Sequence, residues 1–402
     1  MISLVDIEEA RERIKDQIYL SPFPRSETIS GITGNQVFFK LENLQLTGSF
    51  KERGALNRLL TLTPEEVQRG VIAASAGNHG MAVAYHSRRL NIAATIVMPV
   101  AAPLVKVTRV RQYGAESMLC GSDYDTALAE ALRLSEERKF TFISAFDDPW
   151  IIAGQGTIGV EIYEQNPDLD AVIVPVGGGG LIAGIALAVK TLMPKIRVIG
   201  VQAEAVPSMK AALRQGASAR VPAAITIADG IAVRAVGAAP LELVKTYVDE
   251  IVTVSEGEIA NAVLTLLEVE KTVAEGAAAV PLAALLSKKV SLAAKNVGMI
   301  ISGGNIDMNL ISRIIESGLI QDGRLGRFAV VISDRPGSLA RLAQRIADLG
   351  ANILQIGQSR GFGEMAIGET EVELILETTG AGHIERIHDM LSADGFKIKT
   401  AS

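Results

Sequence analysis

The chain has 402 residues, of which 48% are hydrophobic and 21% charged, so it can bury the cores of two or three domains of ordinary size. Its 39 basic and 45 acidic residues give a net charge of -6, and no basic run is long enough to indicate nucleic acid or an anionic membrane as a partner. The single cysteine, Cys120, excludes an intrachain disulfide, and no apolar run reaches the length that spans a bilayer. The N-terminal segment is charged and amphipathic, unlike a signal peptide, so we expect a cytoplasmic protein.

The first helix with a chemical signal is predicted for residues 51–60, after the turn in TGSFKERGA. In such a helix Lys51 lies on one stripe with Ala55 and Leu59, the apolar face. Most inward lysines pack their stem on an apolar face and extend the charge to water. The alternative is a desolvated amine that can form a Schiff base with an aldehyde. We interpret the neighbours Glu52 and Arg53 as a solvated or structural pair.

Short apolar runs alternate with helical segments through the first three quarters of the chain. Near-continuous apolar strands between helices are typical of parallel sheets that are covered on both faces. The pattern therefore predicts an α/β region. A Ser-x-x-Glu capping box at Ser255 and Glu258 marks the beginning of one of its helices. The predicted strands are residues 71–75, 92–99, 171–176, 196–202, 249–254 and 296–302.

Three of these strands lead through a turn into a helix, where free backbone amides can bind an anion. The turns are SAGNHG at 75–80, GGGGL at 177–181 and SGGN at 302–305. Four consecutive glycines can wrap their N–H groups round a phosphate, and the helix dipole adds to the attraction. A flexible joint or close packing of strand and helix is the competing interpretation of the glycines. We favour a phosphate site at 177–181.

The glycine run also satisfies the loose dinucleotide pattern G-x-G-x-x-G/A. Gly178, Gly180 and Ala183 supply the pattern, and Glu204 beyond the next strand is a possible ribose ligand. A nicotinamide-dependent oxidoreductase is therefore one alternative, but it leaves Lys51 without a role. An aldehyde cofactor with a phosphate, pyridoxal phosphate, would use both Lys51 and the glycines.

The third loop offers a partner for the pyridine nitrogen of that cofactor. Ser302 provides a hydroxyl where a stronger electron sink would need a carboxylate. A serine does not force protonation of the ring, which suits β-elimination with prompt loss of a leaving group.

The composition changes near residue 320. The segment SGLIQDGRLG is short, polar and glycine-bearing, as at a domain boundary. A strand with Phe328, Val330 and Ile332 on one face follows, then a helix, a strand, a glycine-rich loop, a strand, a helix and a last strand near FKIK. The order β-α-β-β-α-β predicts a ferredoxin-like unit.

The four motifs FKERGA, SAGNHG, GGGGL and SGGN occur in the order and approximate spacing of the fold-type II pyridoxal-phosphate enzymes. Residues 1 to about 320 resemble the serine/threonine dehydratase family, and within it the threonine dehydratases (threonine ammonia-lyases). The resemblance implies an open, twisted, parallel-sheet catalytic region like that of the tryptophan synthase β chain, with a small subdomain at about 41–145 and a large one formed by 1–40 and 146–320. The last 80 or so residues resemble an ACT domain, with DRPGSL at 334–339 as its mark. We assign 321–326 to a linker and 327–402 to this domain.

The resemblance implies a role for each matched residue. Lys51 would hold the cofactor covalently and move the α-proton, with Phe50 against one face of the ring and Asn78 on its 3-hydroxyl. The loop of residues 75–79 would hold the substrate carboxylate. The implied cofactor-binding residues are Phe50, Lys51, Asn78, Gly177, Gly178, Gly179, Gly180, Leu181 and Ser302. The implied substrate-binding residues are Ser75, Ala76, Gly77, Asn78 and His79.

Two departures from relatives refine this expectation. Racemases of the group carry a second serine that can return a proton to the other face of the substrate, and this chain has Ala76 there. Dehydration is therefore favoured over racemisation. Relatives that bind a divalent ion have an acid six residues after a glutamate, whereas Glu204 is followed there by Lys210. We therefore assign no metal, and we interpret Glu275 in VAEGAAAV as approaching the cofactor or as a structural group.

The resulting expectation is an L-threonine ammonia-lyase that forms 2-oxobutanoate and ammonia, with side activity on L-serine. The alternatives are dehydratases of serine, phenylserine or 3-hydroxyaspartate, a serine racemase, and an amino-acid sensor in which only the C-terminal domain is active. We further expect an amino-acid effector at the ACT domain, or a dimerisation domain without a ligand there, and a homodimer or homotetramer.

Overall fold

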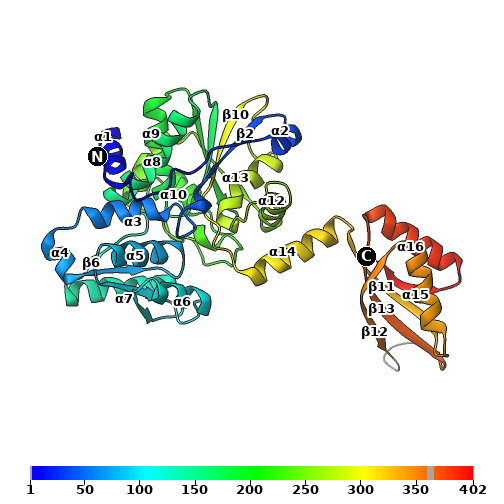
Figure 1. Cartoon of the computed structure of the whole chain (residues 1–402). Helices are drawn as coiled ribbons and strands as arrows, with labels where there is room; N and C mark the ends of the chain where they lie inside the picture. The colour runs from blue at the N-terminus through cyan, green and yellow to red at the C-terminus, as the bar shows by residue number, and fades with distance from the viewer. Residues whose placement is uncertain (1, 360–365, 402) are drawn as a thin grey trace. The chain divides into compact units, whose positions relative to one another are not determined.

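The computed structural model describes residues 2–359 and 366–401, so part of the predicted glycine-rich loop lies outside the described residues. The chain forms two compact units, Met1–Asp307 and Met308–Ser402 (Figure 1). The boundary lies before helix α14 (Met308–Gln321), which groups with the C-terminal unit. The segment 321–326, assigned above to a linker, holds the end of α14, a turn and the first residues of a strand. No helix among the described residues is long and apolar enough to cross a membrane.

The first unit contains a six-stranded sheet whose order is β1-β2-β10-β7-β8-β9. All neighbouring strands are parallel except the edge pair β1 and β2, which is antiparallel. The strand β10, last in the sequence, lies between β2 and β7. The strands are β1 (Arg25–Ser26), β2 (Gln36–Leu41), β7 (Ala171–Pro175), β8 (Arg197–Ala203), β9 (Glu250–Val254) and β10 (Asn296–Ile301).

A second, smaller sheet of the same unit has four parallel strands in the order β5-β4-β3-β6. All six predicted apolar runs are strands in one of the two sheets, which confirms the α/β prediction. The sequence analysis missed β1, β2, β5 and β6, which are short or carry polar residues. The strands of the smaller sheet are β3 (Val71–Ala74), β4 (Ala94–Met98), β5 (Glu116–Leu119) and β6 (Thr141–Phe142).

Helices cover these sheets, as Figure 1 shows. The predicted helix at 51–60 is confirmed as α3 (Lys51–Leu60), and the capping box is present at Ser255, where α12 begins. The α3 helix packs closely on α8 (Pro149–Gln165). A Cβ atom on Gly54 would lie only 2.8 Å from the Ile151 carbonyl oxygen, so the contact leaves no room for a side chain there. The other helices of this unit are α1 (Leu4–Ile14), α2 (Glu27–Thr33), α4 (Pro64–Arg69), α5 (Asn78–Arg89), α6 (Leu104–Gln112), α7 (Tyr124–Arg138), α9 (Gly180–Leu192), α10 (Ser208–Gln215), α11 (Ala238–Tyr247), α12 (Glu256–Glu268) and α13 (Gly276–Leu286), with short 3₁₀ turns at Glu42–Leu44 and Asp229–Ile231.

Of the two interpretations of Glu52 and Arg53, the solvated one is wrong, because both side chains are buried. Arg53 has a structural role, but its partners are Glu42 and Glu161 and not Glu52. Arg53 lies between two carboxylates, Glu42 at 2.8 Å and Glu161 at 2.5 Å. Lys40 contacts Glu161 as well, at 2.6 Å. Buried charges are tolerated when they are paired and hydrogen-bonded, so this cluster anchors α3 to β2 and α8.

The second unit has the predicted order β-α-β-β-α-β after α14. Its antiparallel sheet has the strand order β12-β13-β11-β14. The side chains of Phe328, Val330 and Ile332 lie on one face of β11 and pack in a common core with residues of both helices, such as Leu342 and Ile387. The elements are β11 (Leu325–Ser333), α15 (Ser338–Asp348), β12 (Asn352–Ser359), β13 (Glu369–Glu377), α16 (Ala381–Ala393) and β14 (Lys397–Ala401).

Candidate active site

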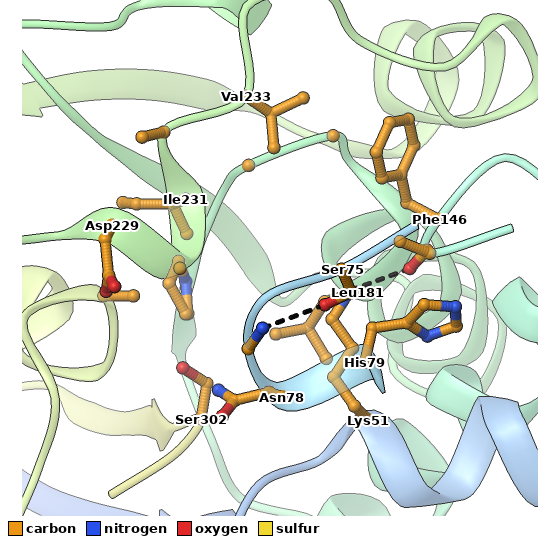
Figure 2. A pocket seen from close by; sticks show the side chains of 18 of the residues that line it. Lys51, Ser75, Asn78, His79, Phe146, Leu181, Asp229, Ile231, Val233 and Ser302 are labelled. Carbon is orange, nitrogen blue, oxygen red and sulfur yellow. Dashed lines mark hydrogen bonds between the residues drawn. The ribbon is translucent and has the colours of Figure 1, made fainter. Parts of the chain in front are cut away.

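One cavity of about 300 Å³ in the first unit brings the predicted motifs together (Figure 2). The carboxyl ends of parallel strands meet at the same edge of a sheet, and the loops that follow β3, β7 and β10 therefore converge with the beginning of α3. Every residue predicted for the cofactor or the substrate lines this cavity: Phe50, Lys51, Ser75, Ala76, Gly77, Asn78, His79, Gly177, Gly178, Gly179, Gly180, Leu181 and Ser302.

Lys51 is the first residue of α3, and its amine lies at the wall of the cavity. The Nζ atom donates a hydrogen bond to the Ala145 carbonyl at 2.7 Å and lies 5.1 Å from the centre of the Phe50 ring. Burial lowers the pKa of the Lys51 amine to about 8, against an opposing attraction from Glu275. A neutral amine, which is the nucleophilic and basic form, is therefore accessible near neutral pH.

The glycine loop leaves no room for side chains. Gly179 has a φ of +100° and is the N-cap of α9. A Cβ atom on Gly178 would lie 2.3 Å from Cγ of Phe146, and one on Gly180 would lie 2.8 Å from the Phe146 carbonyl oxygen. The free amides at the beginning of α9 therefore lie at a cavity wall made of backbone, which fits a phosphate group.

The loop at 75–79 carries a second set of free amides, because α5 begins at Asn78 with Gly77 as its N-cap. The Ser75 hydroxyl accepts a hydrogen bond from the Gly77 amide at 3.1 Å. His79 is buried, and burial together with the nearby Lys51 lowers the pKa of its imidazole to about 3. The ring is therefore neutral at physiological pH. Its Nε2 atom lies 3.0 Å from the Ile143 carbonyl, which can only accept, so Nε2 carries the proton.

Ser302 is buried at the end of β10 and faces the cavity (Figure 2). Its carbonyl accepts a hydrogen bond from the Phe50 amide at 3.0 Å, and a β-bridge joins Ser49 to Gly303 next to it. These bonds hold the residues that precede Lys51 against β10. The serine hydroxyl and the lysine amine are thus built into one rigid wall.

A chain of side-chain amides and one carboxyl completes the wall. The Asn78 amide Nδ2 donates to both oxygens of Glu275, at 2.8 and 3.0 Å, and Asn78 Oδ1 accepts from Asn305 Nδ2 at 2.9 Å. Burial raises the pKa of the Glu275 carboxyl to about 7, although the Asn78 hydrogen bond opposes the rise. Glu275 therefore approaches the site, which was one of the two interpretations of this residue.

The sequence analysis missed much of the remaining lining. Two of the missed residues, Lys106 on α6 and Asp229, form an ion pair at 2.9 Å between the small-sheet and large-sheet parts of the unit. Asn305 was quoted only as part of a motif. The other missed lining residues carry no signal that marks them as site residues: Ala74, Tyr124, Ala145, Phe146, Pro175, Gly230, Ile231, Ala232, Val233 and Ala277.

No group of three or more histidine, cysteine, aspartate or glutamate side chains in residues 2–359 and 366–401 could hold a metal ion. Glu204 does not line the cavity; its backbone amide donates to the Val254 carbonyl. The donors that do line the cavity are an amine, hydroxyls and backbone amides, and this set fits a phosphorylated aldehyde such as pyridoxal phosphate.

Comparison with known proteins agrees with this cavity. The family model described as pyridoxal-phosphate dependent enzyme matches residues 14–303. The L-threonine ammonia-lyase of Thermotoga maritima is 49% identical over 399 residues, which cover 99% of both chains. The catabolic L-threonine dehydratase of Escherichia coli is 45% identical over 315 residues, which cover 78% of this chain and 96% of that protein. The crystal structure of serine racemase from Dictyostelium discoideum matches with a TM-score of 0.72 and 37% identity, over 76% of this chain and 99% of that one. The chain therefore belongs to the family of pyridoxal-phosphate dependent enzymes.

Proposed function

We propose that the chain is an L-threonine ammonia-lyase that converts L-threonine into 2-oxobutanoate and ammonia by α,β-elimination, with side activity on L-serine. The proposal rests on one observation: the Lys51 amine, the glycine loop, Ser302 and the 75–79 loop line the same cavity. The similarity over 99% of the chain to an L-threonine ammonia-lyase supports the substrate.

The cofactor would be held by residues from four segments of the fold-type II architecture. Lys51 would bind its aldehyde carbon, Phe50 would contact the ring and Asn78 the 3-hydroxyl. Gly177 through Leu181 would bind the phosphate, and the Ser302 hydroxyl would contact the ring nitrogen. When bound, pyridoxal phosphate supplies an electron sink that stabilises negative charge at the substrate α-carbon.

The substrate carboxylate would lie on the 75–79 loop, where amides at the beginning of α5 and the Ser75 hydroxyl are available. Neutral His79 adds no charge there. Fixing the carboxylate orients the Cα–H bond towards Lys51, and this positioning lowers the barrier.

Lys51 would then take the α-proton at its Nζ atom, because burial makes the neutral amine available near neutral pH. Ala76 has no proton to return to the opposite face of the substrate. The β-hydroxyl instead leaves as water once it is protonated, and hydrolysis of the resulting enamine releases ammonia. This difference supports a dehydratase over a serine racemase, the function of one structural relative. Dehydratases of serine, phenylserine or 3-hydroxyaspartate are the nearest alternatives.

We also propose that residues 327–402 form an ACT domain that binds a regulatory amino acid at DRPGSL, the loop before α15. The βαββαβ order with four antiparallel strands supports it. A cytoplasmic homodimer or homotetramer, with catalysis in 1–320, completes the proposal.

Keto-acid release from a panel of β-hydroxy amino acids tests the proposed reaction. We expect the highest kcat/KM for L-threonine, a lower value for L-serine and none for 3-hydroxyaspartate. The Lys51→Ala variant should lose keto-acid formation by at least about 10³-fold, because positioned proton transfer alone contributes up to 10⁴-fold. The matched control is Lys15→Ala, which removes an exposed amine outside the cavity. Substantial activity in Lys51→Ala, or a substrate preferred over threonine, would contradict the proposal.

A further inference from the structure

Asn305 contacts three separate segments of the first unit. Its Nδ2 atom donates to the Thr47 carbonyl at 2.7 Å and to Asn78 Oδ1 at 2.9 Å. Its Oδ1 atom accepts from the Arg109 guanidinium at 3.1 Å. The amide also lies directly against the turn before Lys51, because a Cβ atom on Gly48 would be 2.8 Å from Asn305 Oδ1.

The orientation of the Asn305 amide follows from the chemistry of two of these partners. A backbone carbonyl can only accept a hydrogen bond, so the atom that faces Thr47 must be the amide nitrogen. A guanidinium can only donate, so the atom that faces Arg109 must be the amide oxygen. The two atoms of an asparagine amide are otherwise hard to tell apart, and here both contacts require the same assignment.

This assignment determines the orientation of Asn78. Both hydrogens of Asn305 Nδ2 are donated, one of them to Asn78, so the atom of Asn78 that faces Asn305 must be its oxygen. The Asn78 nitrogen then points to Glu275, where it lies 2.8 and 3.0 Å from the two carboxyl oxygens. If the Asn78 amide were flipped, its nitrogen would face the Asn305 nitrogen, and two donors would oppose each other. Its oxygen would face the two oxygens of an ionised Glu275, where acceptors would oppose each other.

We propose that Asn305 is a positioning residue, which fixes the Asn78 amide in the cavity wall with its nitrogen towards Glu275 and its oxygen towards Asn305. The inference rests on the proposed role of Asn78 at the cofactor 3-hydroxyl. In this proposal Asn305 acts through Asn78. Because Arg109 lies on α6 of the small-sheet part, the same contacts link the position of that part to the cofactor site.

A double-mutant cycle tests whether Asn305 acts through Asn78. Apoenzyme of the full chain is titrated with pyridoxal phosphate for the wild type, Asn305→Ala, Asn78→Ala and the double variant. We expect each single substitution to weaken binding about tenfold. The double variant should bind no more weakly than Asn78→Ala, because Asn305 then has no Asn78 amide left to position. Additive losses would overturn the proposal.

The visible absorption band of the bound cofactor separates positioning from a general loosening of the loop. Asn305→Ala and Asn305→Asp should shift the band and its pH dependence in the direction seen for Asn78→Ala. The shift should be larger for Asn305→Asp, since a carboxylate, unlike a methyl group, places acceptor atoms opposite the Asn78 oxygen. Asn43→Ala is the matched control, because Asn43 makes a similar 3.0 Å bond to the Val273 carbonyl but does not contact Asn78. Its band should equal that of the wild type.

The outcomes distinguish this inference from the proposed function. Wild-type protein that binds no pyridoxal phosphate would contradict the proposed function itself. Wild-type protein that binds it, together with an unshifted band in both Asn305 variants, would overturn the positioning role alone. If Asn305→Ala does not fold, the isosteric Asn305→Asp gives the same spectroscopic result.

Discussion

The Lys51 amine and the Glu275 carboxyl show how burial, as the largest cause, tunes two groups of one cavity. Burial disfavours the charged form of each, so it lowers the pKa of the amine to about 8 and raises the pKa of the carboxyl to about 7. Both groups therefore titrate close to neutral pH. The two shifts affect the free energy of unfolding as well as the reaction, because protons are bound differently in the folded and unfolded chain.

The Glu275 carboxyl should make the apoenzyme less stable as the pH rises. Its pKa in the folded state lies above the ordinary value of 4.5, so between about pH 4.5 and 7 the folded chain binds more protons than the unfolded chain. Stability is lost across this window. Glu275→Gln removes the titration, and the variant should gain up to about 3 kcal/mol relative to wild type between pH 5 and 8. Thermal unfolding midpoints at several pH values measure the gain, with Glu8→Gln on the exposed side of α1 as control. If the midpoints of wild type and Glu275→Gln changed with pH in the same way, the raised pKa of the Glu275 carboxyl would be contradicted.

The sequence predicted those site residues that stand in motifs. Lys51 and the glycines could be identified because helix spacing and the absence of side chains have direct chemical meaning. Phe146 and Asp229 could not, because nothing local marks a loop residue that reaches the cavity through the fold. Arg53 was misjudged for the same reason: its partners Glu42 and Glu161 are 11 and 108 residues away, and a charge next to the reactive lysine looks solvated until those partners are placed.

At the scale of elements, the apolar pattern predicted the buried strands and failed at the edges. The β7 strand is buried along its whole length, and its sequence AVIVP shows it. The β1 strand has two residues, and β5 carries Glu116 and Ser117, so neither contains the apolar run by which a buried strand is recognised. The two central strands of the second unit, β11 and β13, could be predicted because each has one buried face, so apolar and polar residues alternate along it.

The turn between β7 and α9 permits a sharp test of the phosphate site. Gly178→Ala places a methyl group 2.3 Å from the Phe146 ring, so the ring or the loop must move. We expect the affinity of the apoenzyme for pyridoxal phosphate to fall by at least about tenfold. Gly257→Ala in α12 adds the same methyl group where no atom lies within 4 Å, and it should leave the affinity unchanged. Equal affinities for Gly178→Ala and wild type would remove the loop from the cofactor site.

At the scale of the whole molecule, the two units suggest a division between catalysis and control. The catabolic dehydratase of Escherichia coli aligns over 96% of its length with only 78% of this chain, so it is too short to contain both units. The first unit also has its own sheets and core clusters. We therefore expect the catalytic unit to fold and react without the C-terminal sheet.

Deletion of residues 322–402, which leaves α14 in place, tests this division. The truncated enzyme should retain kcat on L-threonine within about threefold and lose any change in KM or kcat caused by isoleucine or valine. Steady-state kinetics with each amino acid, on both forms, measure the difference. The proposed regulation by the C-terminal domain is contradicted if the truncated enzyme still responds to isoleucine or valine, or if the full chain responds to neither.

The position of β10 sets the moment at which the enzyme can mature during its synthesis. The strand is the last of the six in sequence, yet it lies between β2 and β7, and it also brings Ser302 to the cavity. A nascent chain that ends before residue 296 has the β1-β2 pair and the β7-β8-β9 group without the strand that joins them. The ribosome must therefore deliver about three quarters of the polypeptide before its first half can finish folding. Until β10 is made, the edges of β2 and β7 that pair with it stay exposed, and chaperones that shield strand edges are needed for longest there.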